Sequence, residues 1–304
     1  MEEANEFIDR FSKQECLPMI TSCSPGWVRF AEKNYPDLLG HLSSCKSPHQ
    51  MFGAMVKSYY AKKYNVDPKK ICMVSVMPCI AKKYECQREE MEVDGLRDVD
   101  YVITTRELSR MIKQANIEFT QLQDDVFDEP MGEATGAGAI FGTTGGVMEA
   151  ALRTAADTLE GKDLPKFEYE AVRGGKGRKE ATVEIAGKKI KAVVVSGLSN
   201  ARKIMDEIRE GKADYQFVEI MACPGGCVMG GGQPIKSSKI RSEVDVRKLR
   251  ADALYTIDEK SVIRKSHESP VMKQMYEEFL QKPGSEVAHK YLHTHYTAKN
   301  MYDI

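Results

Sequence analysis

The stretch "YQFVEIMACPGGCVMGGGQP", residues 215–234, runs from an apolar strand directly into a glycine-rich loop that holds two cysteines. In open α/β sheets, ligands bind just beyond the carboxyl ends of the strands, so Cys223 stands where such a sheet presents a binding site. The segment "CPGGC" lets the backbone wrap tightly around a bulky object and offer its amides to sulfide or another anion. Cys227 is within reach of the same point. The stretch therefore predicts an α/β sheet with a thiolate site at its edge.

Helical and extended patterns alternate along the rest of the chain, as expected for an α/β fold. The apolar run "ICMVSVMPC", residues 71–79, predicts a strand covered on both faces, which is typical of parallel sheets. A strand and then a helix are expected across residues 99–116, with Thr104 or Thr105 as the N-cap. A hairpin is expected to turn near Gly187.

Helical periodicity fills most of the segments between these strands. Ser47 is expected to cap one helix, and Ser199 or Asn200 another. The glycine-rich run "GEATGAGAIFG", residues 132–142, lacks the residue order of a phosphate-binding loop and is interpreted as backbone that passes close to something large. The expected helices span residues 2–14, 25–35, 47–65, 145–161 and 199–211, and a short buried strand is expected at 17–22.

From residue 242 onward the pattern is helical only, at residues 245–259, 271–281 and 286–296. The chain is therefore predicted to fold as an α/β body of two lobes, with mainly parallel sheets flanked by helices and the ligand site between the lobes. A helical C-terminal tail is predicted to pack on this body. We expect the body to comprise residues 1–241 and the tail residues 242–304.

Composition excludes several classes of function. The chain has 304 residues and a net charge of -1, with no block of like charge, so no nucleic-acid or anionic-membrane partner is expected. The start "MEEANEFIDR" lacks the features of a signal peptide, and no segment approaches the roughly 18 apolar residues that span a bilayer. A cytoplasmic protein is expected. The eight cysteines are too sparse for a disulfide scaffold, so they are core residues, metal ligands or reactive thiols.

The positions of the cysteines separate them into two groups. Cys23, Cys79 and Cys223 each end a predicted strand, so their thiols are expected to converge on one point with Cys227. Thiolates in such a set hold iron-sulfur clusters. Zinc is the rival metal, although zinc sites favour paired C-x₂-C knuckles, and simple core packing is the third alternative. The other four are interpreted as inert, small, buried residues: Cys16, Cys45, Cys72 and Cys86.

Three motifs resemble, in order and spacing, the signature motifs of the iron-only, or [FeFe], hydrogenases. They are "TSCSPGW" (21–27), "MPCIAKKYE" (77–85) and "EIMACPGGCVMGGGQP" (219–234). The resemblance covers essentially the whole chain, including a tail similar to the small subunit of the family. It implies an H-cluster, in which a [4Fe-4S] cluster shares one cysteine sulfur with a two-iron subcluster that carries CO, cyanide and a dithiolate bridge. The implied reaction is the reversible reduction of protons to H2.

The resemblance also implies roles for individual residues. The [4Fe-4S] ligands would be Cys79, Cys223 and Cys227, with Cys227 as the shared cysteine. Lys82 would donate to a cyanide ligand, and Glu85 would either orient Lys82 or be merely exposed, while Lys83 is expected to be solvated. The residues that would line or wall the site are Met77, Met221, Ala137, Phe141, Gly142 and Pro48, although the two methionines are equally plausible as core residues. The implied proton route runs outward through Cys23, Glu3, Ser43, Glu6 and Arg10.

Two points in this assignment stay open. Glu3, Glu6 and Arg10 share one helix face, which on physical grounds alone would be an ordinary solvated face. Where many members of the family carry two adjacent cysteines, this chain has Cys23 followed by Ser24. Either the Ser24 oxygen binds iron, or Cys23 is the ligand and the proton route changes, or one iron is unusually ligated. We favour Ser24 at the ligand position, where a harder donor would shift the cluster potential.

The resemblance leaves two classes of function. The first is a catalytic hydrogenase that exchanges electrons with ferredoxin or a nicotinamide-linked partner subunit and depends on H-cluster maturation proteins. The second is a non-catalytic iron-sulfur protein of the sensor or assembly type. The intact motif "MPCIAKK" favours the first. Many relatives have extra cysteine-rich N-terminal domains, so a catalytic domain cut from a longer protein is slightly favoured over a minimal enzyme.

Overall fold

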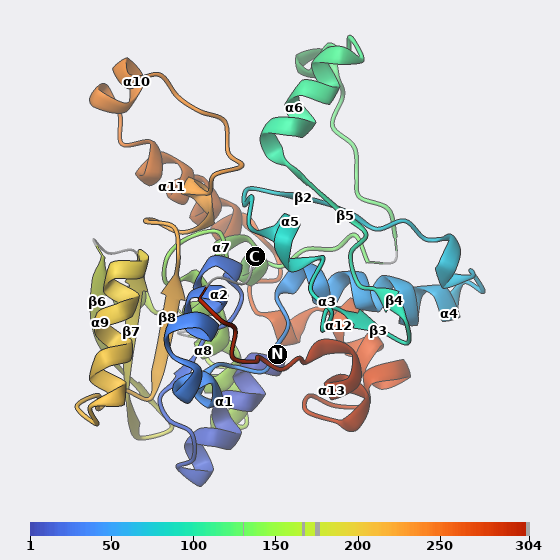
Figure 1. The fold of residues 1–304 in the computed structure, drawn as a ribbon. Helices are drawn as coiled ribbons and strands as arrows, with labels where there is room; N and C mark the ends of the chain where they lie inside the picture. The colour runs from blue at the N-terminus through green and yellow to red at the C-terminus, as the bar shows by residue number, and fades with distance from the viewer. Residues whose placement is uncertain (130, 166–167, 174–176, 302–304) are drawn as a thin grey trace.

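The computed structural model describes residues 1–129, 131–165, 168–173 and 177–301. The chain forms two lobes, each built on its own sheet (Figure 1). Helices cover the larger sheet on both faces, and the second, smaller sheet lies beside α5 and α6. The predicted α/β class is therefore confirmed. Within the described residues, no helix is both long and apolar enough to cross a membrane.

The larger sheet has the strand order β1-β8-β7-β6. Its strands are β1 (Met19–Ile20), β8 (Phe217–Met221), β7 (Lys188–Ser196) and β6 (Arg178–Ile185). The first three are parallel, and β6 pairs antiparallel with β7. All of β8 is buried, as expected for a strand covered on both faces. The predicted hairpin turn is confirmed, because Ala186 and Gly187 both have positive φ, 50° and 70°, as a two-residue type I′ turn requires.

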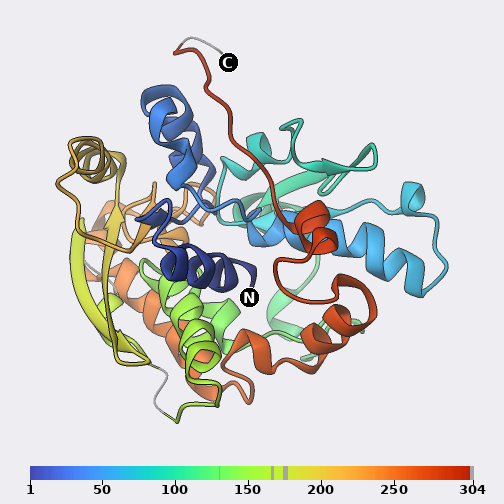
Figure 2. The same cartoon turned by 90° about the horizontal axis from the view of Figure 1, so that it is seen from below.

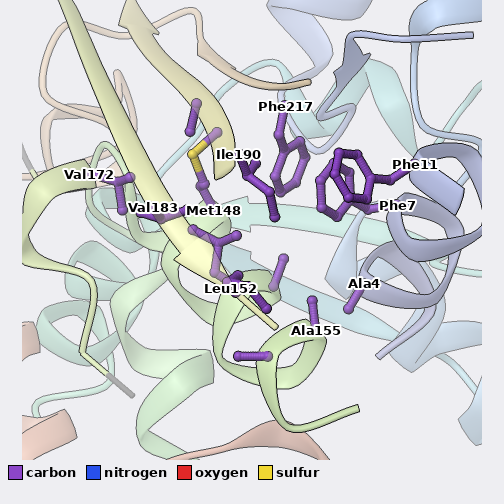
Figure 3. Close-up of a cluster of buried hydrophobic side chains, with 14 of the residues drawn as sticks. Ala4, Phe7, Phe11, Met148, Leu152, Ala155, Val172, Val183, Ile190 and Phe217 are labelled. Carbon is purple, nitrogen blue, oxygen red and sulfur yellow. The ribbon is translucent and has the colours of Figure 1, made fainter. Parts of the chain in front are cut away.

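Helices α1 (Glu2–Lys13) and α8 (Gly146–Glu160) cover one face of this sheet. Figure 3 shows the core that they form, in which Phe7, Met148 and Leu152 surround Phe217 of β8. Helices α2 (Pro25–Asn34) and α9 (Leu198–Arg209) cover the other face, with Trp27 and Ile204 packed in one cluster with Val218 and Ile220. Successive residues of β8 thus serve opposite cores. The predicted cap of α9 was wrong: the helix begins at Leu198, after Gly197 with φ 85°.

The second lobe contains the parallel pair β2 (Val74–Met77) and β5 (Tyr101–Thr104). The prediction that β2 is covered on both faces was wrong, because Val74 and Val76 are 46% and 44% exposed. The sheet has only these two strands, and the described residues cover only the face that carries Ser75 and Val102. The Thr104 cap is confirmed by a capping box with Glu107 at the start of α6.

The remaining elements of this lobe are short. One continuous helix combines α3 (Pro48–Met55), a π-helical turn (Val56–Tyr60) and α4 (Ala61–Lys63). The others are α5 (Lys82–Glu85), α6 (Thr105–Gln114) and the antiparallel pair β3 (Glu92–Val93) and β4 (Leu96–Arg97). Across the described part of the whole chain, 3₁₀ segments lie at Pro36–His41, Pro68–Lys70, Phe119–Gln121, Glu170–Val172, Cys227–Met229 and Ser266–Glu268.

The C-terminal segment is helical up to residue 292. Its helices are α10 (Ser238–Glu243), α11 (Val246–Lys260), α12 (Pro270–Met275) with a π-helical turn (Tyr276–Leu280), and α13 (Glu286–Leu292). The prediction of a helix to residue 296 was wrong, because the chain becomes extended at His293 and pairs with Cys45. Helix α11 lies against α7 (Gly136–Ile140) so closely that a Cβ on Gly136 would meet the Asp258 carboxylate at 2.2 Å.

A buried ionic network joins α11 to the body. The Arg153 guanidinium of α8 donates to both Asp258 oxygens at 2.8 Å and to Glu149 at 2.8 Å, and all three side chains are almost completely buried. Arg264 and Arg173 bind the remaining sides of the two carboxylates. The junction therefore depends on charges that only compensate one another when every member is present.

We predict that Arg153→Met lowers the free energy of unfolding by about 3 kcal/mol, because removing one partner leaves buried carboxylates undercompensated. Urea unfolding followed by circular dichroism measures the change. Lys248→Met is the matched control, since Lys248 forms a solvent-exposed pair with Asp252 on α11 and its loss should leave the midpoint unchanged. A loss below about 1 kcal/mol for Arg153→Met would contradict the prediction.

Candidate metal centre

The glycine-rich loop after β8 lies between the two lobes and hydrogen-bonds to both. The Val228 amide donates to the Gly142 carbonyl at 2.9 Å, and the Gly232 amide donates to the Pro78 carbonyl at 2.8 Å. A Cβ on Gly226, which has φ 88°, would lie 2.8 Å from the backbone of Thr144. These positions have no room for a side chain. The backbone of this loop therefore packs directly against the backbone of both lobes, while the expectation that it passes close to a large bound group stays a prediction.

Three of the predicted ligand cysteines come together here from the two lobes. Cys223 follows β8, Cys79 follows β2, and Cys227 opens the 3₁₀ turn after "CPGG". Burial raises the pKa of the Cys227 thiol to about 11, and the neighbouring Cys79 and Cys223 thiols raise it as well. Mutual effects of this kind act only between groups that lie near one another.

The donor chemistry of these thiols bears on which metal group they could hold. Among the described residues, the groups whose ligand atoms all lie within 4.8 Å of one another do not include Cys79, Cys223 and Cys227 together. A single zinc ion needs its ligands at about 2.3 Å and therefore closer together than that. The donors that lie near one another here are thiols, and thiolates are the ligands that hold iron-sulfur clusters.

The first motif reaches the same place through Cys23 and Ser24. Ser24 precedes α2, and its hydroxyl accepts a hydrogen bond from the Ala222 amide at 3.3 Å, next to Cys223. Burial raises the pKa of the Cys23 thiol well above its usual value, and the nearby Glu3 carboxyl raises it further. The Cys23 thiol therefore keeps its proton at neutral pH.

Lys82 is the buried cation of the site. Its ammonium donates to the Cys23 carbonyl at 2.9 Å and to both Glu85 oxygens at 2.9 and 3.0 Å. Burial would raise the pKa of Glu85, but Lys82 and His49 outweigh it and lower the pKa to about 2. Ser47 is the N-cap residue of α3, as predicted, but its hydroxyl donates to Glu85 at 2.7 Å and makes no hydrogen bond to the helix amides. Glu85 thus orients Lys82, and the alternative of an exposed Glu85 was wrong.

The predicted wall residues occupy different environments. Ala137 is fully buried, and Met221 is buried within β8. The Gly142 carbonyl accepts a hydrogen bond from the Val228 amide. Met77 packs beside Cys86, Val99 and Val102. Pro48 and Phe141 line a mainly apolar cavity of about 290 Å³ between α3 and α12, to which Met51, Met55, Met272 and Met275 also contribute. Lys83 is partly exposed and pairs with Glu107.

The acidic face of α1 lies against residues 43–45 and is not an ordinary solvated face. The Glu6 and Arg10 side chains are only 13% and 16% exposed and pair at 2.7 Å. The Ser43 hydroxyl donates to Glu6 at 2.7 Å. Burial raises the pKa of Glu3 to about 8, the Glu6 charge adds to the effect, and a hydrogen bond with Ser43 opposes it. Glu3, Ser43, Glu6 and Arg10 therefore form one connected series.

The cysteines interpreted as inert divide into two pairs. Cys45 and Cys86 are buried, but Cys16 and Cys72 are exposed, so the prediction of a core position was wrong for the latter pair. Both exposed residues lie outside regular elements, where apolar neighbours do not bury them. The Cys45 thiol also donates to Glu6 at 3.7 Å, so Cys45 lies beside the acidic series.

Sequence reasoning missed Glu219, which lies within β8. Its carboxyl accepts hydrogen bonds from the Gly145 amide at 2.6 Å and the Met148 amide at 2.8 Å, at the start of α8. Burial raises its pKa to about 7, although these amides oppose the rise. The available signal was a carboxyl residue in the middle of the apolar run "FVEIM".

Two family models match the chain. The model for the iron only hydrogenase large subunit, C-terminal domain, matches residues 1–231. The model for the iron hydrogenase small subunit matches residues 244–299. Together they account for most of the sequence.

Similar proteins include both hydrogenases and assembly factors. Iron hydrogenase 1 of Clostridium pasteurianum is 52% identical over 97% of this chain and 52% of its own length. The NADP-reducing hydrogenase subunit HndD of Solidesulfovibrio fructosivorans is 48% identical over 97% of this chain and 51% of its own length. The chain thus spans about half the length of these curated relatives. A cytosolic Fe-S cluster assembly factor of Danio rerio is 33% identical over 98% of this chain and 74% of its own length.

Solved structures give the same relationship. An apo [FeFe]-hydrogenase from Chlamydomonas reinhardtii superposes with a TM-score of 0.84 at 42% identity, covering 99% of this chain and 82% of that chain. A second [FeFe]-hydrogenase structure, concerned with stepwise H-cluster assembly, superposes with a TM-score of 0.83 at 42% identity and the same coverage.

We predict that Glu3→Gln flattens the pH dependence of stability. Folded Glu3 keeps its proton up to about pH 8, whereas an unfolded glutamate loses it near its ordinary value of 4.5. Between these values the folded protein binds more protons than the unfolded chain, so the free energy of unfolding falls as pH rises. Removing the carboxyl should reduce this slope by up to about 1.4 kcal/mol per pH unit.

Urea unfolding of both proteins at pH 5, 6, 7 and 8 measures the slope. Asp9→Asn provides the control, because Asp9 lies on the exposed side of the same helix and pairs there with Lys13. Equal slopes for Glu3→Gln and the unmodified chain would show that Glu3 ionises normally in the folded protein.

Proposed function

The chain belongs to the iron-only hydrogenase family, and on that premise we propose that it is a catalytic [FeFe]-hydrogenase domain, which interconverts H2 with two protons and two electrons. The observation that carries the proposal is the meeting of three thiols from two lobes beside a buried ammonium and a partly buried, protonated carboxyl. Lys82 and Glu3 reach this place from α5 and α1, and both act on Cys23. A purely electron-carrying cluster site has no need of such a proton-bearing group.

Cys79, Cys223 and Cys227 would hold a [4Fe-4S] cluster, and the Cys227 sulfur would be shared with a two-iron subcluster that carries CO, cyanide and a dithiolate bridge. When bound, this H-cluster supplies the redox chemistry of hydrogen. The chain contributes fixed donors around it: the Lys82 ammonium, held by Glu85 and the Cys23 carbonyl, can satisfy an anionic ligand without solvent. Met77, Met221, Ala137, Phe141, Gly142 and Pro48 are proposed to line or wall the site.

Ser24 is proposed as the fourth cluster ligand, in the position where the family carries a second cysteine. Its hydroxyl faces the Ala222 amide beside Cys223, which supports this assignment. A serine oxygen is a harder donor than a thiolate, so it favours the more oxidised state of the irons. The neutral Cys23 thiol then remains free to carry a proton.

The proton route is proposed to use four groups in order. The Cys23 thiol and the Glu3 carboxyl are both protonated at neutral pH, so each can donate a proton inward. The Ser43 hydroxyl donates to Glu6 and contacts Glu3, so it can pass a proton between the two carboxyls. Arg10 pairs with Glu6 at the outer end and holds its carboxylate in place.

The assembly-factor relatives support a second candidate, a non-catalytic iron-sulfur protein. The hydrogen-bonded Lys82 and the protonated Glu3 favour the catalytic candidate. The proposed small-molecule partners are H2 and protons. The proposed electron partner is ferredoxin or a nicotinamide-linked subunit. H-cluster maturation proteins are proposed to supply the two-iron subcluster. No nucleic-acid or membrane partner is proposed. A cytoplasmic location stays a prediction, because relatives are named both periplasmic and cytosolic.

We predict that the chain, produced together with the maturation proteins, shows CO and cyanide bands in the infrared and evolves hydrogen from a reduced electron donor. Alanine at Cys79, Cys223 or Cys227 should abolish the cluster absorbance and the activity. Cys72→Ala is the control, since Cys72 is exposed and lies outside the site. A chain that binds the [4Fe-4S] cluster but shows neither bands nor turnover after maturation would support the non-catalytic candidate.

We predict that Ser24→Cys keeps the cluster and changes its reduction potential, because a soft thiolate replaces an oxygen. Ser24→Ala should lower cluster retention. Redox titration followed by electron paramagnetic resonance measures the potential, and iron analysis measures retention. Equal potentials and iron contents in the three proteins would place Ser24 outside the ligand set.

A further inference from the structure

The chain after α13 pairs directly with the loop that presents Ser43. Residues His293 and Cys45 form an antiparallel bridge. The Lys46 amide donates to the Leu292 carbonyl at 2.9 Å, and the Thr294 amide donates to the Ser44 carbonyl at 2.7 Å. Figure 2 shows this dark red segment leaving the last helix and running back past the blue N-terminal elements. The C-terminal segment therefore lies against the backbone of the proposed proton route.

The His293 side chain is buried at this junction and has a partner on each ring nitrogen. Nε2 lies 3.0 Å from the Glu2 carboxylate, and Nδ1 lies 2.8 Å from the Ser44 hydroxyl. Burial would raise the pKa of Glu2, but His293, Tyr276 and the Gly284 amide outweigh it and lower the pKa. Glu2 is therefore a carboxylate that only accepts, so Nε2 must carry a hydrogen. This fixes the ring orientation and turns Nδ1 toward Ser44.

Ser44 in turn holds the Glu6 carboxylate. Its amide donates to both Glu6 oxygens at 3.1 Å. The Ser43 hydroxyl donates to Glu6 at 2.7 Å, and the Cys45 amide donates to Ser43 at 3.2 Å. One ligand atom each from Glu6, Cys45 and His293 lies within 4.8 Å of the others, although each already has protein partners. A shift of Ser44 would therefore change the contact between Ser43 and Glu6.

We infer that His293 is a positioning residue for the proton route: by binding Ser44 and Glu2, it holds the Ser43–Glu6 pair at hydrogen-bonding distance. The catalytic consequence rests on the proposed function, whereas the positioning itself does not. The segment matched by the small-subunit model thus contributes to the route that the large-subunit region carries.

Substitutions at His293 can separate the two ring contacts. An asparagine nitrogen or oxygen occupies nearly the place of Nδ1, and a glutamine nitrogen nearly that of Nε2. His293→Asn should therefore keep the Ser44 contact and lose Glu2, and His293→Gln should do the reverse. His293→Phe loses both and keeps the ring volume. His295→Gln is the control, because His295 lies two residues further along the same extended segment and is exposed.

Two measurements on the whole chain test the inference. Hydrogen–deuterium exchange of the peptide that contains residues 43–46 reports the positioning without any cluster. Hydrogen evolution in H2O and D2O, after maturation, reports the proton route. For His293→Phe we expect exchange at these amides to rise about tenfold and turnover to fall about tenfold, with a larger solvent isotope effect and unchanged CO and cyanide bands. His293→Asn should restore most of the amide protection and most of the turnover, whereas His293→Gln should restore little of either. His295→Gln should match the unmodified chain in both measurements.

The outcomes separate the two proposals. Unchanged exchange in His293→Phe would overturn the positioning role, whatever the activity. Increased exchange with unchanged turnover and isotope effect would overturn the link to the proton route. Absence of hydrogen turnover in the unmodified, matured chain would overturn the proposed function, while the exchange result would still decide whether His293 positions Ser44.

Discussion

The backbone hydrogen bonds that hold residues 223–232 between the lobes are the constraint on which the site depends. Val228 binds the Gly142 carbonyl from one lobe, and Gly232 binds the Pro78 carbonyl from the other. The adjoining Cys79, Cys223 and Cys227 can meet only while both contacts are made. Glycine at 226 and 230 is what allows them, because a Cβ on Gly230 would lie 2.2 Å from the Pro78 carbonyl. The relative position of the lobes and the geometry of the thiols are therefore set by the same few atoms.

Burial then decides which acidic groups keep their protons. Glu85 and Glu2 have cationic or hydrogen-bonding partners strong enough to lower their pKa despite burial. Burial raises the pKa of Glu3 and the nearby Glu6 charge raises it further, and the contacts that oppose this rise, including the hydrogen bond with Ser43, do not outweigh it. The result is a hydrogen-bonded ammonium and a protonated carboxyl that both lie near Cys23.

Local sequence signals predicted the elements that depend on neighbouring residues. The turn at Gly187, the Thr104 cap and the cysteines at strand ends all follow from short patterns. The exposure of Val74 and Val76 did not follow from a short pattern, because the burial of a strand face depends on which other elements of the lobe pack against it. The partners of Glu219 and His293 lie 71 and 291 positions away in the chain, so no local pattern could identify these residues as part of the site. The lone glutamate in an apolar strand marked an anomaly without revealing its partner.

Among the contacts between the C-terminal segment and the body, three lie next to parts of the candidate site. Asp258 binds Arg153 and lies against Gly136, at the start of the helix that carries Ala137. The Leu254 side chain limits the space at Gly142, whose carbonyl accepts the hydrogen bond from the Val228 amide. His293 holds Ser44 beside Glu6. Since these junctions use ionic, apolar and hydrogen-bonded contacts, loosening the segment would disturb the proposed wall and the proposed proton route together.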